Sequence, residues 1–203
     1  MSGLFIAMEG GDGAGKSTQV KLLAQNLESR GHEVLITREP GGSPIAEKIR
    51  HVVLDVANLG LNERAEALLF AASRAEHVAS TIKPALDLGK TVISDRYMDS
   101  SIAYQGIARG LGLEHIRNLN LWATNNLVPH LTIILDVEAE HGLNRVADPN
   151  RLEEESTEFH AIVRDAFLQL ATLDPDRYLV VSANLPAEEI AEVIFERVLS
   201  LGT

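Results

Sequence analysis

A glycine-rich segment that ends in a lysine and two hydroxyl residues carries the clearest chemistry in this sequence. It follows the apolar run Leu4–Met8 and matches the pattern G-x-x-x-x-G-K-[ST]. In this pattern backbone N–H groups and the lysine surround nucleotide phosphates, while the first hydroxyl is a ligand for Mg²⁺. The alternative is a turn that binds nothing, which the lysine and the strand–loop–helix setting disfavour. We predict a nucleotide-phosphate site formed by Gly10, Gly11, Asp12, Gly13, Ala14, Gly15, Lys16, Ser17 and Thr18.

A charged pair follows each of two further predicted strands. Arg38 and Glu39 open the segment Arg-Glu-Pro-Gly-Gly, and Asp95 and Arg96 open Asp-Arg-Tyr. Beside a phosphate-binding loop, an acid at a strand end suits Mg²⁺ or its water, and arginine binds phosphate through two donors. The alternatives are a plain Pro-Gly-Gly turn and a structural Asp–Arg pair. A crevice shared with the glycine-rich loop favours the functional interpretation of both segments.

Two pairs of side chains have the chemistry to recognise a planar base. Phe70 and Arg74 lie four residues apart in a predicted helix and so share a face. A ring for stacking and a fork of donors suit a base, although a core phenylalanine and a solvated arginine are the commoner pattern. Tyr104 and Gln105 both donate and accept hydrogen bonds, as a base edge or a ribose requires. A helix start capped by Ser100 is compatible with that role.

The segment 145–153 has two interpretations. It is either an ordinary polar connection between helices or a mobile loop whose arginines, Arg145 and Arg151, close over a nucleotide and neutralise the transferred group.

Short apolar segments alternate with helical patterns along the chain, which predicts one α/β domain over residues 1–203. The sheet is expected to be mostly parallel and five-stranded, with ligands at the carboxyl ends of its strands. Asn62 is a candidate cap, Gly31 ends the first helix, and Pro186 begins the last. One face of the helix 157–173 is predicted to be buried through Phe159, Ile162, Val163, Ala166, Phe167 and Leu170. We predict strands at 4–8, 33–37, 90–94, 131–136 and 178–182, and helices at 16–30, 44–54, 62–87, 114–127, 139–146, 157–173 and 187–200.

Composition excludes several classes of function. The chain has 29 acidic and 18 basic residues, a net charge of −11 and no basic run, so we expect no nucleic-acid partner. No apolar run is long enough for a membrane span, and the N-terminus does not resemble a cleaved signal. The absence of cysteine agrees with a cytoplasmic location. An acidic protein that binds an anionic nucleotide must gather its few cations locally.

In this order and at these separations, the motifs resemble the thymidylate kinase family of P-loop nucleoside monophosphate kinases. The resemblance covers almost the whole chain and rests on residues 9–18, 37–42, 70–74, 95–97, 103–106, 135–137 and 151–153. It implies a P-loop NTPase-type three-layer fold with a short lid at about 145–156, Mg²⁺ as cofactor, and a homodimer formed through helices 44–54 and 62–87. It also implies transfer of the γ-phosphoryl group of ATP to dTMP, in dTTP biosynthesis.

The resemblance also implies a role for each site residue. Arg96 holds the dTMP phosphate, Phe70 stacks on thymine, Arg74 bonds its edge, and Asp12, Arg38, Glu39, Ser101, Tyr104 and Gln105 complete the dTMP site. Lys16, Asp95, Arg96 and Arg151 are the catalytic candidates, Ser17 and Asp95 the metal ligands, and Arg145 a contact of the adenine. The expected lid is shorter than in many bacterial members and contains Asp148-Pro149-Asn150.

Two rival functions remain at this point. The chain could phosphorylate another nucleoside monophosphate or a deoxynucleoside, or it could be a P-loop switch ATPase. The sequence has no Asn-Lys-x-Asp guanine signature, and a switch has no evident use for the base-recognition pairs.

Overall fold

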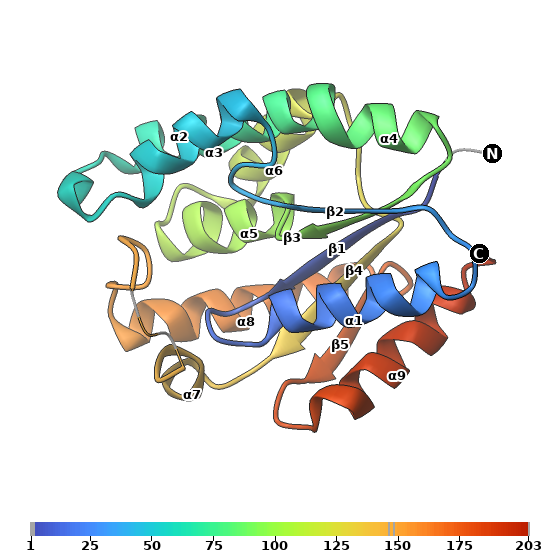
Figure 1. Ribbon diagram of the computed structural model, residues 1–203. Coiled ribbons are helices and arrows are strands. Elements are labelled where there is room, and N and C mark those ends of the chain that lie inside the picture. Colours follow the sequence, from blue (N-terminus) through green and yellow to red (C-terminus); the bar gives the residue numbers. More distant parts are fainter. Residues whose placement is uncertain (1–2, 146, 148, 203) are drawn as a thin grey trace.

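A five-stranded parallel sheet forms the centre of the computed structural model, which describes residues 3–145, 147 and 149–202 (Figure 1). All four strand pairings are parallel, and the strands stand in the order β2-β3-β1-β4-β5. The predicted fold class and all five predicted strands are therefore confirmed. Their bounds are β1 (Phe5–Gly10), β2 (Val34–Arg38), β3 (Thr91–Asp95), β4 (Leu131–Asp136) and β5 (Tyr178–Ser182).

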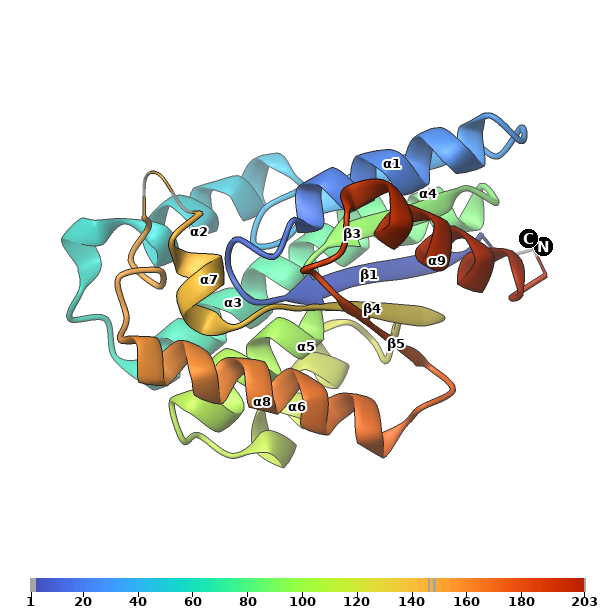
Figure 2. The ribbon, with the colours of Figure 1, turned by 90° about the horizontal axis from the view of Figure 1, so that it is seen from below.

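Helices cover both faces of the sheet and make three layers (Figures 1 and 2). One face carries α1 (Lys16–Glu28) and α9 (Ala187–Leu199); the other carries α3 (Glu63–His77), α4 (Lys83–Asp87), α5 (Met98–Ser101), α6 (Leu113–Ala123) and α8 (Thr157–Leu173). The remaining helices are α2 (Pro44–Leu54), which packs on α3, and the short α7 (Ala139–Leu143). Among the described residues, no helix combines the length and apolar character that a bilayer span requires.

Side-chain alternation along β1 explains how one strand serves two cores. Ile6 and Met8 point toward α1 and α9, while Phe5 and Ala7 pack with residues of α4 and β3 on the opposite face. All four side chains are fully buried. A strand that is covered on both faces has apolar residues at successive positions, and this continuous run is what predicted β1 from the sequence.

The register of the strands brings their carboxyl ends to one edge. Arg38 at the end of β2 is level with Asp95 at the end of β3, and Asp95 is level with Met8 of β1. The segments that follow β1, β2 and β3 therefore begin side by side. This is the edge at which the sequence predicted ligands to collect.

The predicted helix 62–87 is interrupted by a π-helical segment, η2 (Val78–Ile82), between α3 and α4. Pro84, in the first turn of α4, has no N–H to continue the preceding hydrogen-bond ladder. A π-helical turn accommodates that loss while the chain keeps its direction. Asn62 caps α3 as predicted, because its side chain accepts bonds from the N–H groups of Arg64 and Ala65.

The sequence did not predict the helical segment that follows Asp-Arg-Tyr. The short helix α5 runs into a second π-helical segment, η3 (Ile102–Ala108). Ser100 does not cap this segment, since the helix already begins at Met98 and the Ser100 hydroxyl bonds Glu9. Several buried residues of this segment are polar, so its sequence lacks the periodic spacing of apolar residues that indicates a helix.

Smaller differences concern helix ends and one face of α8. Helix α1 ends at Glu28, with Gly31 three residues beyond, and Pro186 is the N-cap of α9. Ile162, predicted to lie on the buried face of α8, is 45% exposed. The buried face of α8 instead includes His160, whose ring packs against Tyr104 and Phe159.

Candidate active site

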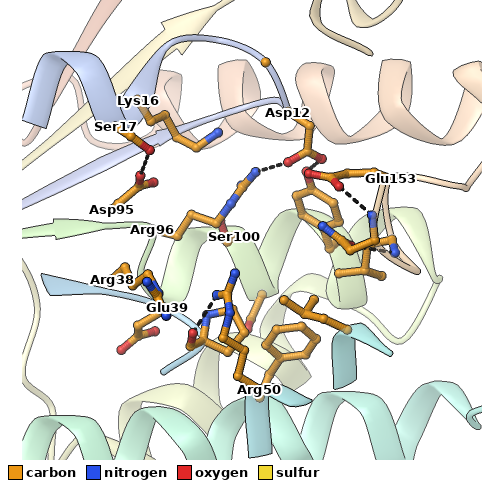
Figure 3. Close-up of a pocket in the computed structure, with 18 of the residues that line it drawn as sticks. Asp12, Lys16, Ser17, Arg38, Glu39, Arg50, Asp95, Arg96, Ser100 and Glu153 are labelled. Atoms are coloured by element: carbon orange, nitrogen blue, oxygen red, sulfur yellow. Dashed lines mark hydrogen bonds and ion pairs between the residues drawn. The ribbon is translucent and has the colours of Figure 1, made fainter. Parts of the chain in front are cut away.

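A cavity of about 570 Å³ lies at the carboxyl edge of the sheet and unites most of the predicted site residues (Figure 3). It does not include Gly10, Gly11, Ala14 or Arg151. The predicted residues that line it are Asp12, Gly13, Gly15, Lys16, Ser17, Thr18, Arg38, Glu39, Phe70, Arg74, Asp95, Arg96, Ser101, Tyr104, Gln105 and Arg145.

The glycine-rich loop packs closely against α7. Gly13 has a φ of +70°, and a Cβ at this position would lie 1.9 Å from the Gly142 carbonyl oxygen. Gly15, with a φ of +89°, leads directly into α1 and provides no side-chain cap. The N–H groups of the first turn of α1 are therefore left to an anion at the positive end of the helix dipole.

Lys16 folds back over this loop toward the cavity. Its Nζ donates to the carbonyl oxygens of Gly11, at 2.7 Å, and Gly10, at 3.1 Å. Burial, together with the positive charge of Arg96, lowers the pKa of the Lys16 ammonium to about 8. A negatively charged ligand beside the ammonium would raise its pKa again.

Ser17 and Asp95 place two side-chain oxygens close together beside the loop. The Ser17 hydroxyl donates to the Asp95 carboxylate across 2.7 Å. The described residues contain no cluster of three or more His, Cys, Asp and Glu side chains that would bind a metal unaided. One hydroxyl and one carboxylate fit Mg²⁺, which takes few protein ligands and completes its shell with water and phosphate oxygens.

Arg96 joins the glycine-rich loop to the third strand. It adopts a positive φ of 69°, unusual for a side-chain-bearing residue, and donates to the Gly10 carbonyl and to the Asp12 carboxylate. The Tyr104 hydroxyl donates to the other oxygen of Asp12 at 2.8 Å. Burial works to raise the pKa of Asp12, but the charges of Arg96 and Lys16 lower it on balance. Figure 3 shows Lys16, Asp12 and Arg96 pointing into one space.

Arg74 is fixed by a buried network at the opposite wall. Its Nε donates to Glu39 at 2.6 Å, and Nη1 donates to Ser101 at 2.9 Å and to Asn120. Its Nη2 donates to the Tyr97 carbonyl oxygen at 2.9 Å. Of the five N–H groups of a guanidinium, one on Nη2 has no partner among the described residues. Arg74 therefore offers the cavity a single, oriented donor.

Arg50, which no sequence motif predicted as a site residue, also lines the cavity. It lies on α2, and its Nη1 donates to the Pro40 carbonyl at 2.7 Å. Arg38 is more exposed and pairs with Glu47 at 3.0 Å. One feature of the sequence could have indicated Arg50. It lies on the helix that directly follows the segment Arg38–Gly42, so the fold brings its positive charge close to that segment.

Glu153 is a second missed residue of the cavity wall. Its carboxylate accepts a hydrogen bond of 2.7 Å from the Asn150 backbone, and burial raises its pKa. In the sequence, Glu153 stands out only as the last residue of the segment 151–153. Only Leu152 separates it from Arg151, and this proximity in the sequence concealed that the Glu153 side chain lines the cavity while that of Arg151 bonds Glu66.

The two lid arginines have separate positions, whereas Val146 and Asp148 of the same predicted lid lie outside the described residues. Arg145 lines the cavity and donates to the Gly13 carbonyl of the phosphate loop at 3.3 Å. Arg151 is 2% exposed, and its guanidinium donates to Glu66 at 2.7 Å and to the Val53 carbonyl at 2.8 Å. The structure thus brings Arg145, but not Arg151, to the phosphate loop.

The cavity is locally cationic in an acidic chain, as the composition led us to expect. Four acidic residues line it, against six basic ones, which are Lys16, Arg38, Arg50, Arg74, Arg96 and Arg145. Such a concentration of donors within a concave site attracts phosphate groups.

A parallel sheet with a phosphate loop after β1 and a cationic crevice beside it defines a P-loop phosphotransferase of the nucleoside monophosphate kinase class. The family model described as thymidylate kinase matches residues 8–194. The chain belongs to the thymidylate kinase family. The matches favour this kinase interpretation over a switch ATPase.

Individual relatives agree over nearly the whole chain. The thymidylate kinase of Clavibacter michiganensis subsp. michiganensis is 50% identical over 99% of this chain and 97% of its own. That of Symbiobacterium thermophilum is 50% identical over 94% of this chain and 90% of its own. The crystal structure of thymidylate kinase from Ehrlichia chaffeensis superposes with a TM-score of 0.78 and 33% identity, and the match covers 100% of both chains.

Proposed function

We propose that this chain transfers the γ-phosphoryl group of ATP to dTMP, giving dTDP and ADP. The single observation that carries the proposal is the shared cavity, in which a phosphate loop faces Arg96 on one side and Phe70 with Arg74 on the other. A donor nucleotide and an acceptor nucleotide can therefore meet end to end. Membership of the thymidylate kinase family supports dTMP as the acceptor.

In this proposal the loop and the arginines align two phosphates. Lys16 and the N–H groups at the start of α1 hold the ATP phosphates, while Arg96 and Arg50 hold the phosphate of dTMP. Transfer through a loose transition state requires alignment and charge neutralisation more than covalent chemistry. The acceptor phosphate is already an anion, so no general base is needed.

Ser17 and Asp95 would hold Mg²⁺, which supplies charge neutralisation at the transferred phosphate when it is bound. Arg145 is the lid residue best placed to add positive charge there, because it already contacts the phosphate loop. Arg151 is held elsewhere, so we assign it to the base of the lid. Asp12 is positioned by Arg96 and Tyr104 to contact the sugar of the acceptor.

Phe70 would stack on thymine, and the remaining N–H of Arg74 would donate to a base carbonyl. Glu39 and Ser101 act through Arg74, whose orientation they maintain. We further propose a cytoplasmic homodimer. Large apolar side chains left exposed on α2 and α3, namely Ile45, Val52 and Leu68, support the dimer.

A coupled assay of ADP release with ATP and a panel of acceptors tests the function. We expect dTMP to have the highest kcat/KM, above dUMP, dCMP, dAMP, dGMP and thymidine. A different preferred acceptor would assign the chain to another kinase. Hydrolysis of ATP that is independent of every acceptor would indicate a switch ATPase.

A further inference from the structure

A buried carboxylate lies behind the wall that we assign to the base. Glu66 of α3 is 1% exposed and does not line the cavity. Its Oε1 accepts a hydrogen bond of 2.9 Å from Nε2 of Gln105, which does line the cavity. Its Oε2 accepts one of 2.7 Å from Nη2 of Arg151. Glu66 thus connects the base of the lid to the wall of the base site.

The chemistry of this contact determines which way the Gln105 amide points. A carboxylate only accepts hydrogen bonds, so Glu66 can bind the NH₂ end of the amide but not its oxygen. Arg151 and, at 3.5 Å, Arg109 surround the same carboxylate with positive charge. A flipped amide would place its oxygen against a carboxylate oxygen, and neither of these two oxygens can donate a hydrogen bond to the other.

We propose that Glu66 is a positioning residue that makes Gln105 an acceptor toward the base, and so selects thymine over cytosine. This inference rests on the proposed function. Thymine has an N–H at N3 and a carbonyl at C4, whereas cytosine has an acceptor at N3 and an amino group at C4. The oriented Gln105 oxygen matches the N3 donor, and the remaining Arg74 N–H matches the C4 carbonyl. The wall therefore presents one acceptor and one donor in the order that thymine requires.

The Glu66→Gln variant inverts this polarity. Arg151 retains its need for an acceptor and keeps the oxygen of the new amide on its side. The new NH₂ group then faces Gln105, which must turn its own oxygen toward residue 66 and its NH₂ into the cavity. A donor at this place suits N3 of cytosine and opposes N3–H of thymine.

The experiment compares kcat/KM for dTMP and for 5-methyl-dCMP, which carry the same 5-methyl group and differ at N3 and C4. We expect the preference for dTMP to fall roughly 10–100-fold in Glu66→Gln, since leaving a polar group mismatched costs that much in specificity. The loss should appear in KM more than in kcat. The double variant Glu66→Met/Arg151→Met removes both the acceptor that orients Gln105 and the buried cation that would be left unpaired, so the preference for dTMP should fall here too if the single variant does not fold.

Arg109→Gln is the matched control, because it weakens the same cluster without changing the group that faces Gln105. Its acceptor preference should stay within about twofold of the wild type, even if its stability falls. An unchanged preference in both Glu66 variants, or an equal loss in the control, overturns the inference. Failure of the wild type to phosphorylate dTMP would instead overturn the proposed function, so the two failures are distinguishable.

Discussion

The Ser17 hydroxyl donates a hydrogen bond of 2.7 Å to the Asp95 carboxylate, which joins the first turn of α1 to the end of β3. These two residues are 78 positions apart in the sequence. Their oxygens stand beside the phosphate loop, where a kinase requires a divalent cation. Parallel register, rather than any local motif, brings these two oxygens together.

Ser17→Ala should therefore weaken the response of turnover to Mg²⁺. We expect the Mg²⁺ concentration that gives half-maximal activity to rise ~10–100-fold, the range typical when support for a metal site is lost. Initial rates measured over a Mg²⁺ titration at fixed ATP and dTMP check this. Ser29→Ala, an exposed hydroxyl at the other end of α1, serves as the control. An identical titration for the two variants would remove Ser17 from the metal site.

Lys16 provides a prediction about pH. Its pKa of about 8 in the free protein means that the ammonium loses its charge as pH rises through that value. Bound phosphates favour the charged form, so the Kd for a non-hydrolysable ATP analogue should increase by up to about tenfold for each pH unit above 8. Calorimetry between pH 7 and 9.5 measures this. Lys16→Arg should bind with a flat profile, because arginine keeps its charge.

Removing the lysine tests its catalytic role separately. Lys16→Ala should lower kcat/KM by roughly 10²–10³-fold, as loss of one donor to a developing charge does elsewhere. Lys21→Ala, on an exposed part of α1, should keep the wild-type rate. A near-wild-type rate for Lys16→Ala contradicts the proposed function of the loop.

Arg145 and Arg151 should respond differently to the same substitution. Arg145→Met should reduce kcat about 10²-fold or more with an unchanged melting temperature, because its side chain is exposed and is held by a single long hydrogen bond within the described part of the chain. Arg151→Met should instead destabilise the fold by about 3–5 kcal/mol, since it leaves Glu66 buried without its partner. Steady-state kinetics and thermal unfolding of both variants separate the roles. A stable Arg151→Met protein with a collapsed kcat would restore Arg151 as the catalytic lid residue.

The sequence was most informative where function depends on local pattern. The strands and the phosphate loop were predicted because β-strand burial and phosphate binding impose residue types over a few adjacent positions. Local pattern could not show that Arg145 and Arg151 have different positions. Arg151 is held by a buried partner, Glu66, that lies 85 residues away in the sequence. Arg50 was not predicted either, because an arginine on an amphipathic helix is expected to face solvent. Only the tertiary fold shows that it lines the cavity.

Glu9, buried at the end of β1, leads to a prediction about stability. It accepts hydrogen bonds from the Tyr97 and Ser100 N–H groups, and burial together with the charge of Asp99 raises its pKa from 4.5 to about 7. The folded state therefore holds this proton more tightly than the unfolded state. Its contribution to stability is complete below pH 4.5 and is lost as pH rises through about 7.

Glu9→Gln isolates that contribution, since the amide keeps an acceptor for both N–H groups but does not titrate. The free energy of unfolding of the wild type, relative to this variant, should fall by up to about 3 kcal/mol as pH rises from 4.5 to 7, at about 1.4 kcal/mol per pH unit. Urea titrations at pH 5, 6, 7 and 8 measure the difference. Parallel pH profiles for the two proteins would show that Glu9 ionises normally.

The exposed apolar face of α2 and α3 yields the last prediction. Leu68 is 58% exposed on α3, the helix that packs against α2, and a monomer gains nothing from a large apolar side chain in that setting. If two copies bury this face against each other, Leu68→Lys places a charge in the interface, where desolvation without a partner is costly. We expect sedimentation of the wild type at micromolar concentration to give twice the 22.1 kDa chain mass, and that of Leu68→Lys to give the monomer mass.

Leu88→Lys, which changes a 76% exposed leucine after α4, is the control and should remain dimeric. A monomeric wild type contradicts the proposed dimer, and a dimeric Leu68→Lys protein moves the interface away from this face.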